Sequence, residues 1–344
     1  MEKRIDYFDY LRVLAIYAVI TIHVLSKNWY DLNVNTFEWQ IFNIYDSICR
    51  WSVPVFIMIS GALLLGKEHN IKKIFKKNIF HLTIAFLFWG IIYAIINYQN
   101  KEQFIIKVIS GHYHMWFIQM IVGLYICTPI LKKIVESEKI TKYFLVLSFC
   151  FNFLFPQIIL LVNDFGGETL IKIFNTIDLL LNKINLQIVL GYTGYFIGGY
   201  YLNKIDINKK YRKILYILGI LGALITILLS AYISFVKQQP IENYYGNFCI
   251  NILIQAIAVF VWFKYNAFRF KKIYNIIKKI SECSFGIYLV HVLIIDYLIK
   301  ILKLNILSFN PLLSIPTISF IVFIISFILS AILKKIPLLK KYIV

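Results

Sequence analysis

Acidic side chains are scarce in this sequence. Only 17 aspartates and glutamates stand against 36 lysines and arginines, which gives a formal net charge of +19. Such an excess can indicate a nucleic-acid partner. Here, however, the lysines lie in short segments between long apolar runs, which is where membrane topology places them. We therefore expect a lipid bilayer as the partner, and no nucleic acid.

Paired cysteines are also missing. The five cysteines form no C-x-x-C pair and show no metal-ligand spacing; they are Cys49, Cys127, Cys150, Cys249 and Cys283. All lie in or beside apolar runs, where a cysteine acts as a small hydrophobic residue. The sequence therefore predicts no metal site.

A cleavable signal peptide is a third absence. The first apolar run is followed by Ser26-Lys27-Asn28-Trp29 rather than by a cleavage site of small residues. We expect this run to be retained as the first membrane helix.

Apolar sequence is what the chain has in abundance. It is 60% hydrophobic with a mean hydropathy of +0.74, well beyond the range of soluble domains. Most of its ten apolar stretches approach the ~20 residues that cross a bilayer; they run over 9–27, 48–66, 79–97, 115–134, 143–163, 186–203, 213–235, 246–264, 282–301 and 312–333. The stretch at 186–203 is diluted by Gly191, Gly194, Gly198 and Gly199, which would also let neighbouring helices approach closely.

Segments rich and poor in lysine alternate between these stretches without a break. The rich ones are the N-terminus, 67–77, 132–142, 204–213, 264–279 and 334–341. Because lysine-rich loops stay in the cytoplasm, the alternation predicts cytoplasmic placement of both termini. We expect an all-α polytopic bundle of about ten helices, forming a single integral membrane domain over 1–344 in the cytoplasmic membrane.

Ionisable residues inside apolar runs are costly and are candidates for function. The first stretch carries two, Arg12 and His23. Eleven helical steps separate them by roughly 16 Å along the axis and by only ~20° around it, so both lie on one stripe. Arg12 could also be a boundary arginine paired with Asp9, and His23 a hydrogen-bonded core histidine; the shared stripe favours function.

Other polar residues lie near the expected helix ends. Arg50 is expected to begin the second helix on the outer side, as a flanking anchor or as a clamp for an anion or carbonyl. His114 and Trp116 open the fourth helix on the same side, where Trp116 alone would fit an aromatic belt. Tyr288 and His291 share a face of the ninth helix, which favours a buried polar network over simple packing.

Three further histidines, His69, His81 and His112, fall in loops or at boundaries and are set aside. The candidate residues that are retained lie toward both ends of the bundle. His23, Arg50 and His114 are expected in the outer half and Arg12 at the inner edge.

Residues 9–23 resemble the opening of the membrane acyltransferase family called acyltransferase 3. The family's mark is an arginine, ten residues and then a histidine, a spacing that Arg12 and His23 match. Four further stretches resemble the family in the same order, at 50–61, 114–129, 194–202 and 284–291. Since five stretches stay in register over nearly the whole chain, the resemblance is far more specific than one Arg-x10-His match.

The resemblance implies transfer of an acyl group, usually acetyl from acetyl-CoA, to a hydroxyl of an extracytoplasmic or lipid-linked glycan. It implies acetyl-CoA as co-substrate and no metal. Some relatives carry an additional hydrolase-like domain, whereas this chain resembles the type without one. An extracytoplasmic partner protein therefore stays open, as do acyl groups other than acetyl.

Each candidate residue then has an expected role. His23 is the base, or alternatively the carrier of an acyl group, and Arg50 polarises the developing oxyanion or holds the acceptor. Arg12 contacts the phosphates of the donor. The residues expected to orient His23 or bind substrate are His114, Trp116, Tyr288 and His291. The alternative is an exporter of a polysaccharide unit, but neither an internal repeat nor a second Arg-x10-His pattern supports it.

Overall fold

The computed structural model describes residues 4–66, 71–184, 186, 189 and 191–344, and no strand occurs among them. The helices are α1 (Asp6–Leu25), α2 (Phe37–Cys49), α3 (Ser52–Leu65), α4 (Ile71–Lys73), η1 (Ile74–Ile79), α5 (Phe80–Ile96), α6 (Lys101–Ser110), η2 (Tyr113–Met115), α7 (Trp116–Glu136), α8 (Glu138–Ser148), η3 (Phe149–Leu154), α9 (Phe155–Phe165), α10 (Glu168–Lys183), α11 (Thr193–Lys204), α12 (Lys209–Lys237), η4 (Asn243–Tyr245), α13 (Ile250–Asn266), η5 (Ala267–Ile273), α14 (Tyr274–Lys300), α15 (Pro311–Leu333) and α16 (Pro337–Tyr342).

The all-α polytopic architecture is confirmed. Nine helical segments in the described ranges are long and apolar enough to cross a membrane. They correspond to nine of the ten apolar stretches. The remaining stretch, 186–203, contains α11, which has only 12 residues. Part of that stretch lies outside the described residues, at 187, 188 and 190.

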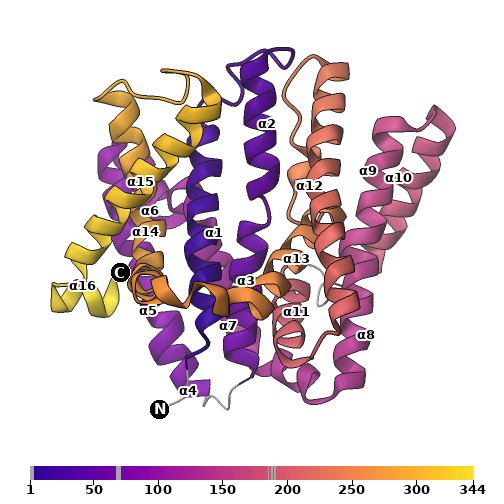
Figure 1. Cartoon of the computed structure of the whole chain (residues 1–344), viewed down its shortest axis with the longest axis horizontal. Helices are drawn as coiled ribbons and strands as arrows, with labels where there is room; N and C mark the ends of the chain where they lie inside the picture. Colours follow the sequence, from indigo (N-terminus) through magenta and orange to yellow (C-terminus); the bar gives the residue numbers. More distant parts are fainter. Residues whose placement is uncertain (1–3, 67–70, 185, 187–188, 190) are drawn as a thin grey trace.

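Several helices extend beyond what hydropathy indicated. The second span begins at Phe37 because α2 precedes α3, and the segment 164–185, expected as a loop, contains α10. Charged and amide side chains in α2 and α10 lower their average hydropathy, although their apolar residues still recur at helical spacing. Neither α6 nor α10 buries a residue in the protein, and α10 forms a hairpin with α9 at the side of the bundle (Figure 1).

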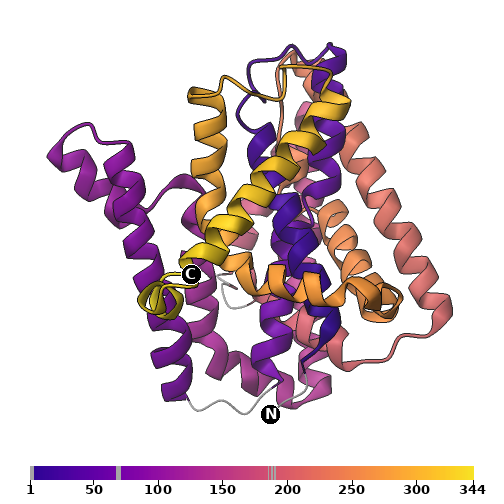
Figure 2. The same cartoon turned by 60° about the vertical axis from the view of Figure 1, so that its left-hand side comes forward.

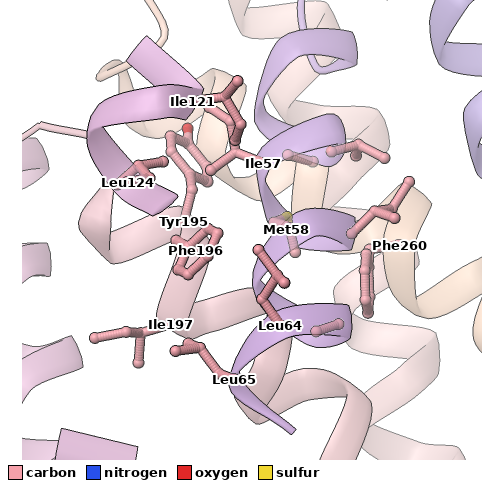
Figure 3. Packing of buried hydrophobic residues seen from close by; sticks show 14 of the residues in the cluster. Ile57, Met58, Leu64, Leu65, Ile121, Leu124, Tyr195, Phe196, Ile197 and Phe260 are labelled. Atoms are coloured by element: carbon pink, nitrogen blue, oxygen red, sulfur yellow. The ribbon is translucent and has the colours of Figure 1, made fainter. Parts of the chain in front are cut away.

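Helix α3 lies at the centre of the largest hydrophobic cluster. It packs against α1, α7, α11 and α13. Ile57 and Met58 of α3 contribute to this cluster together with Phe196 of α11 and Phe260 of α13, each almost fully buried (Figure 3). The core therefore holds α3 in place, together with the polar residues at its N-terminal end.

Two glycines let α3 and α11 approach until their backbones touch. A Cβ atom at Gly61 would lie 1.8 Å from the carbonyl oxygen of Phe196, and one at Gly199 would lie 2.0 Å from that of Met58. Small residues at such crossings are common between membrane helices, because association there depends on close packing. The expectation that glycines of the 186–203 stretch permit close helix contact is confirmed at Gly199.

Replacing Gly61 with alanine is expected to destabilise the protein by about 1–3 kcal/mol, because the added methyl group meets backbone rather than a movable side chain. The matched control is Gly123→Ala in α7, where a Cβ atom would meet nothing within 4 Å. Thermal unfolding in detergent should show a lower Tm for the first variant alone. Equal Tm values for both variants would contradict this account of the crossing.

Helix α1 lies in the middle of a second group of packed helices. It contacts α2, α3, α14 and α15, which surround it in both views (Figures 1 and 2). Just beyond its end, Lys27 pairs with Asp296 of α14 at 2.7 Å between Nζ and Oδ1. This ion pair fixes the end of α1 that carries His23 against the helix that carries His291.

Candidate active site

His23 lies in the last turn of α1 and lines a cavity of about 280 Å³, here called the His23 cavity. Its walls come from α1, the start of α3, the first residue of α7 and the segment before α13. The lining residues are Val19, Ile22, His23, Arg50, Val53, Trp116, Glu242, Tyr245, Gly246 and Asn247. The structure therefore brings three of the predicted site residues, His23, Arg50 and Trp116, to one cavity.

The predicted position of Arg50 at the start of the second helix is wrong. Arg50 follows the last residue of α2, Cys49, and lies at the break between α2 and α3, inside a helical segment that began at Phe37. The error arose because α2 is too polar to be recognised as part of a membrane span. The consequence for the site is that Arg50 lies within a long helical segment, with its side chain half-buried beside the cavity, instead of flanking the span.

The charge of Arg50 is balanced within the protein. Its Nη2 donates a short hydrogen bond to the buried carboxylate of Asp46, one turn earlier on α2. The guanidinium carbon lies 4.4 Å from the centre of the Tyr245 ring, within the range of a cation–π contact. Its Nε is buried and has no hydrogen-bond partner among the described residues. One N–H donor of Arg50 therefore stays available beside the cavity.

Behind His23 lies a cluster of imidazole rings. The ring of His291 is 5.1 Å from that of His23, and the ring of His114 is 5.2 Å from His291 and 6.2 Å from His23, measured between centroids. His114 and His291 are 1% and 0% exposed. The predicted polar network around Tyr288 and His291 is thus present, and it includes His114.

Hydrogen bonds define the orientation of His291 and of the loop before α7. His291 Nδ1 lies 2.6 Å from the carbonyl oxygen of Tyr288. Because a carbonyl can only accept, Nδ1 carries the proton, and Nε2, buried without a partner in the described part of the chain, keeps its lone pair. The Tyr288 hydroxyl donates to the carbonyl oxygen of His114, which joins α14 to η2.

His112 belongs to the same cluster, although the sequence analysis set it aside. Its Nδ1 lies 2.9 Å from Nδ1 of His114, so one of these nitrogens donates to the other. The His112 ring also stacks on Tyr93 with centroids 4.4 Å apart, and it lines a second cavity of about 480 Å³. The His-x-His spacing of 112 and 114 was the one sequence signal that could have indicated this pairing.

Other functional candidates had no signal in the sequence. Asp46, Glu242 and Tyr245 are ordinary polar residues in segments that resembled loops, and Asn247 is an uncharged residue at the start of an apolar stretch. Only the packing of the segment 242–247 beside α1 and α3 brings its side chains to the cavity. His69, also set aside at first, lies outside the described residues.

Arg12 lies in a different cavity, of about 650 Å³, toward the N-terminal end of α1. This Arg12 cavity is lined from α1, α3, α11 and α14 and includes Arg4, Asp9, Asn203, Ser281 and Glu282. Arg12 and His23 share a stripe of α1, yet the structure places them in two separate cavities at opposite ends of the helix.

Asp9 neutralises the N-terminal arginine more than it does Arg12. Arg4 donates two hydrogen bonds to the Asp9 carboxylate, of 2.7 and 2.8 Å, whereas the nearest nitrogen of Arg12 is 3.9 Å away. The hydrogen bond with Asp9 raises the pKa of Arg4 above its ordinary value. Ser281 also donates to Asp9 at 2.7 Å. The expected Asp9–Arg12 pair is therefore weak, and Arg12 makes no closer ion pair among the described residues, so its guanidinium can bind an anion.

No group of three or more histidine, cysteine, aspartate or glutamate side chains in the described ranges could hold a metal ion. The imidazole cluster is a network of hydrogen bonds and ring contacts that joins η2 to α14.

Comparison with known proteins identifies the family of this chain. A family model described as an acyltransferase domain matches residues 5–331, which is nearly the whole chain and includes every residue that lines the His23 and Arg12 cavities except Arg4. No curated protein and no solved structure matches the chain. Because one model covers both cavities and the helices that form them, the chain belongs to the acyltransferase 3 family of membrane acyltransferases.

Proposed function

We propose that the protein transfers an acetyl group from cytoplasmic acetyl-CoA to a hydroxyl of an extracytoplasmic or lipid-linked glycan. One observation carries this proposal. Two buried polar atoms beside the same cavity, Nδ1 of His23 and Nε of Arg50, have no hydrogen-bond partner among the described residues. Unpaired polar atoms in an apolar interior are costly, so a substrate that pairs with them would account for their presence.

The chemical step needs one base and one oxyanion donor. His23 accepts the proton of the acceptor hydroxyl as its oxygen attacks the thioester carbonyl. Arg50 donates to the oxygen on which negative charge develops. The carbon–sulfur bond then breaks, the acetyl group stays on the glycan oxygen, and the thiolate of CoA takes the proton from His23. No net proton is gained or lost.

The surrounding imidazoles serve as positioning residues. His291 packs against His23 and is itself held by the carbonyl oxygen of Tyr288. His114 packs against both rings, and Tyr288 holds its backbone in place. These contacts restrict the rotation of His23, which is the usual way that a catalytic base is kept in a productive orientation.

The acceptor side of the His23 cavity suits a sugar. Trp116 is 37% exposed and offers an aromatic face, while Glu242 and Asn247 offer hydrogen-bonding groups. Glu242 also accepts a hydrogen bond from Tyr30 at 2.9 Å. An aromatic wall with a few convergent polar groups fits a polyhydroxylated ligand.

The donor is expected on the side of Arg12. The Arg12 guanidinium and the lysine-rich segments expected on the same side provide the positive charge that the phosphates of CoA require. If this side faces the cytoplasm, as the lysine distribution predicts, the protein lies in the cytoplasmic membrane with its acceptor site outward.

Replacing Arg12 with glutamine is expected to raise the KM for acetyl-CoA about 10-fold, the effect of losing one charge-assisted hydrogen bond. The KM for the acceptor should stay unchanged. Asp9 retains Arg4, Ser281 and Tyr274 as partners, so the variant should fold normally. Initial rates at varied donor and acceptor concentrations measure the two KM values separately. An unchanged donor KM with a reduced kcat would instead assign Arg12 to the chemical step.

The function as a whole is tested with purified protein in proteoliposomes, radiolabelled acetyl-CoA and a panel of bacterial glycan acceptors. We expect label in the glycan fraction, absent from empty liposomes. Glycan flux into vesicles without acyl-CoA, together with no acyl transfer, would favour an exporter. Label retained on the protein without an acceptor would indicate an acyl-histidine intermediate. Activity that requires an added extracytoplasmic protein would reveal a partner.

A further inference from the structure

We propose that a second basic cavity, separate from the Arg12 cavity, binds the phosphate group of an anionic ligand. This lysine cavity has a volume of about 680 Å³. Five lysines line it, namely Lys72, Lys73, Lys76, Lys77 and Lys341. Four of them come from α4 and η1 and the fifth from α16, at the other end of the sequence. If the ligand is an anionic phospholipid, this proposal goes beyond the proposed function. If the ligand is the acyl-CoA donor, the proposal rests on the proposed function.

The C-terminal helix is held in place by specific contacts. His81 Nδ1 lies 3.1 Å from the carbonyl oxygen of Lys341, to which it donates, and the rings of Phe80 and Tyr342 meet edge to face at 6.4 Å. Beyond α16, Trp89 donates to the carbonyl oxygen of Ile343 at 3.3 Å, and Ile343 is buried. Lys341 is therefore fixed at the cavity by packing. It also lies beyond residue 331, where the family match ends, so this cavity is not a feature of the matched region alone.

The arrangement of the lysines has an energetic cost. Lys73 and Lys77 are four residues apart along one helical segment, and like charges at that spacing destabilise a helix. Within the described part of the chain, no carboxylate lines the cavity. A bound anion would offset the repulsion among the ammonium groups. The π-helical form of η1 is consistent with a binding role, since such turns occur frequently at functional sites.

The chemistry of the lining identifies the ligand class. Several flexible ammonium groups around an open cavity suit a phosphate, which accepts hydrogen bonds from many directions. The exposed ring of Phe80 and the ring of Tyr342 offer apolar surface beside the charges. Two sources share this chemistry: the headgroup of an anionic phospholipid, and the phosphates of the acyl-CoA donor.

Binding assays that need no acyl transfer test the proposal. Phosphatidylglycerol retention is measured in nanodiscs of mixed phosphatidylglycerol and phosphatidylcholine, and adenosine 3′,5′-bisphosphate binding is measured by calorimetry. The test variant is the triple substitution Lys73→Gln, Lys76→Gln and Lys77→Gln. The matched control removes the same charge from the exposed start of α12, with Lys209→Gln, Lys210→Gln and Lys213→Gln.

We expect the test variant to bind one of the two probes about 100-fold more weakly, because each lysine contributes about fivefold to the affinity. Lys341→Gln alone should weaken the same probe about fivefold. Loss of phosphatidylglycerol retention identifies a headgroup site, and loss of nucleotide binding identifies a donor-phosphate site. If neither probe distinguishes the test variant from the control triple, the proposal is wrong. This result would leave the proposed acetyl transfer intact, because that activity is measured separately.

Discussion

Replacing His23 with alanine is expected to lower kcat for acyl transfer by about 10²- to 10⁴-fold, the usual contribution of a general base. The reason is structural as well as chemical. His23 is the only imidazole that lines the His23 cavity in the described ranges, while His114 and His291 lie behind it. The measurement is the rate of label transfer from radiolabelled acetyl-CoA in proteoliposomes.

Two controls separate a lost base from a lost fold. The Tm of His23→Ala in detergent should stay close to that of the wild type, because Nδ1 of His23 makes no hydrogen bond within the described structure that the variant would lose. Added imidazole should restore part of the activity by occupying the vacated space. Full activity without imidazole would exclude His23 as the base.

Replacing Arg50 with methionine is expected to reduce kcat by about 10²- to 10³-fold, the effect of removing one donor to an oxyanion. The KM values for donor and acceptor should change little, because this interaction strengthens only as charge develops. Arg50→Lys should recover little activity. A lysine could still pair with Asp46, but it has no counterpart of the Nε donor that now lies unpaired beside the cavity.

The Asp46 carboxylate complicates the interpretation of Arg50→Met, because the single variant leaves a buried negative charge without its partner. Breaking such a pair typically costs about 3–5 kcal/mol of stability. The double variant Asp46→Asn with Arg50→Met removes both charges and should recover the Tm while activity stays low. If activity returns together with stability, Arg50 serves the fold and not the reaction.

The extent of sequence-based prediction differs between the fold and the site. Hydropathy was sufficient for the long helices, since a run of about 20 apolar residues has few stable alternatives to spanning the bilayer. It was insufficient for α2 and α10, whose polar residues lower the average although they remain helical. Arg50 was misplaced because hydropathy did not identify α2 as part of the second span. Both termini facing the cytoplasm stays a prediction.

For the site, the rule that ionisable residues in apolar runs are functional candidates selected His23, Arg50 and His291 before any geometry was known. The rule did not select His112, because this residue lies at a helix boundary, where a polar residue costs little. The distance of 2.9 Å between the Nδ1 atoms of His112 and His114 depends on the local turn at η2 and on the stacking of His112 against Tyr93, a contact with another helix.

By itself the sequence determined that this protein crosses the membrane repeatedly and which charged residues the bilayer must accommodate. These properties depend on local composition, because the cost of placing a residue in hydrocarbon is set mainly by that residue and its neighbours in one helix. Tertiary structure alone decided that Arg12 and His23 open into separate cavities, that Asp46 balances Arg50, and that Glu242 and Asn247 face His23. Such relations depend on which helices pack together, and close packing is a property of the whole bundle that no single segment encodes.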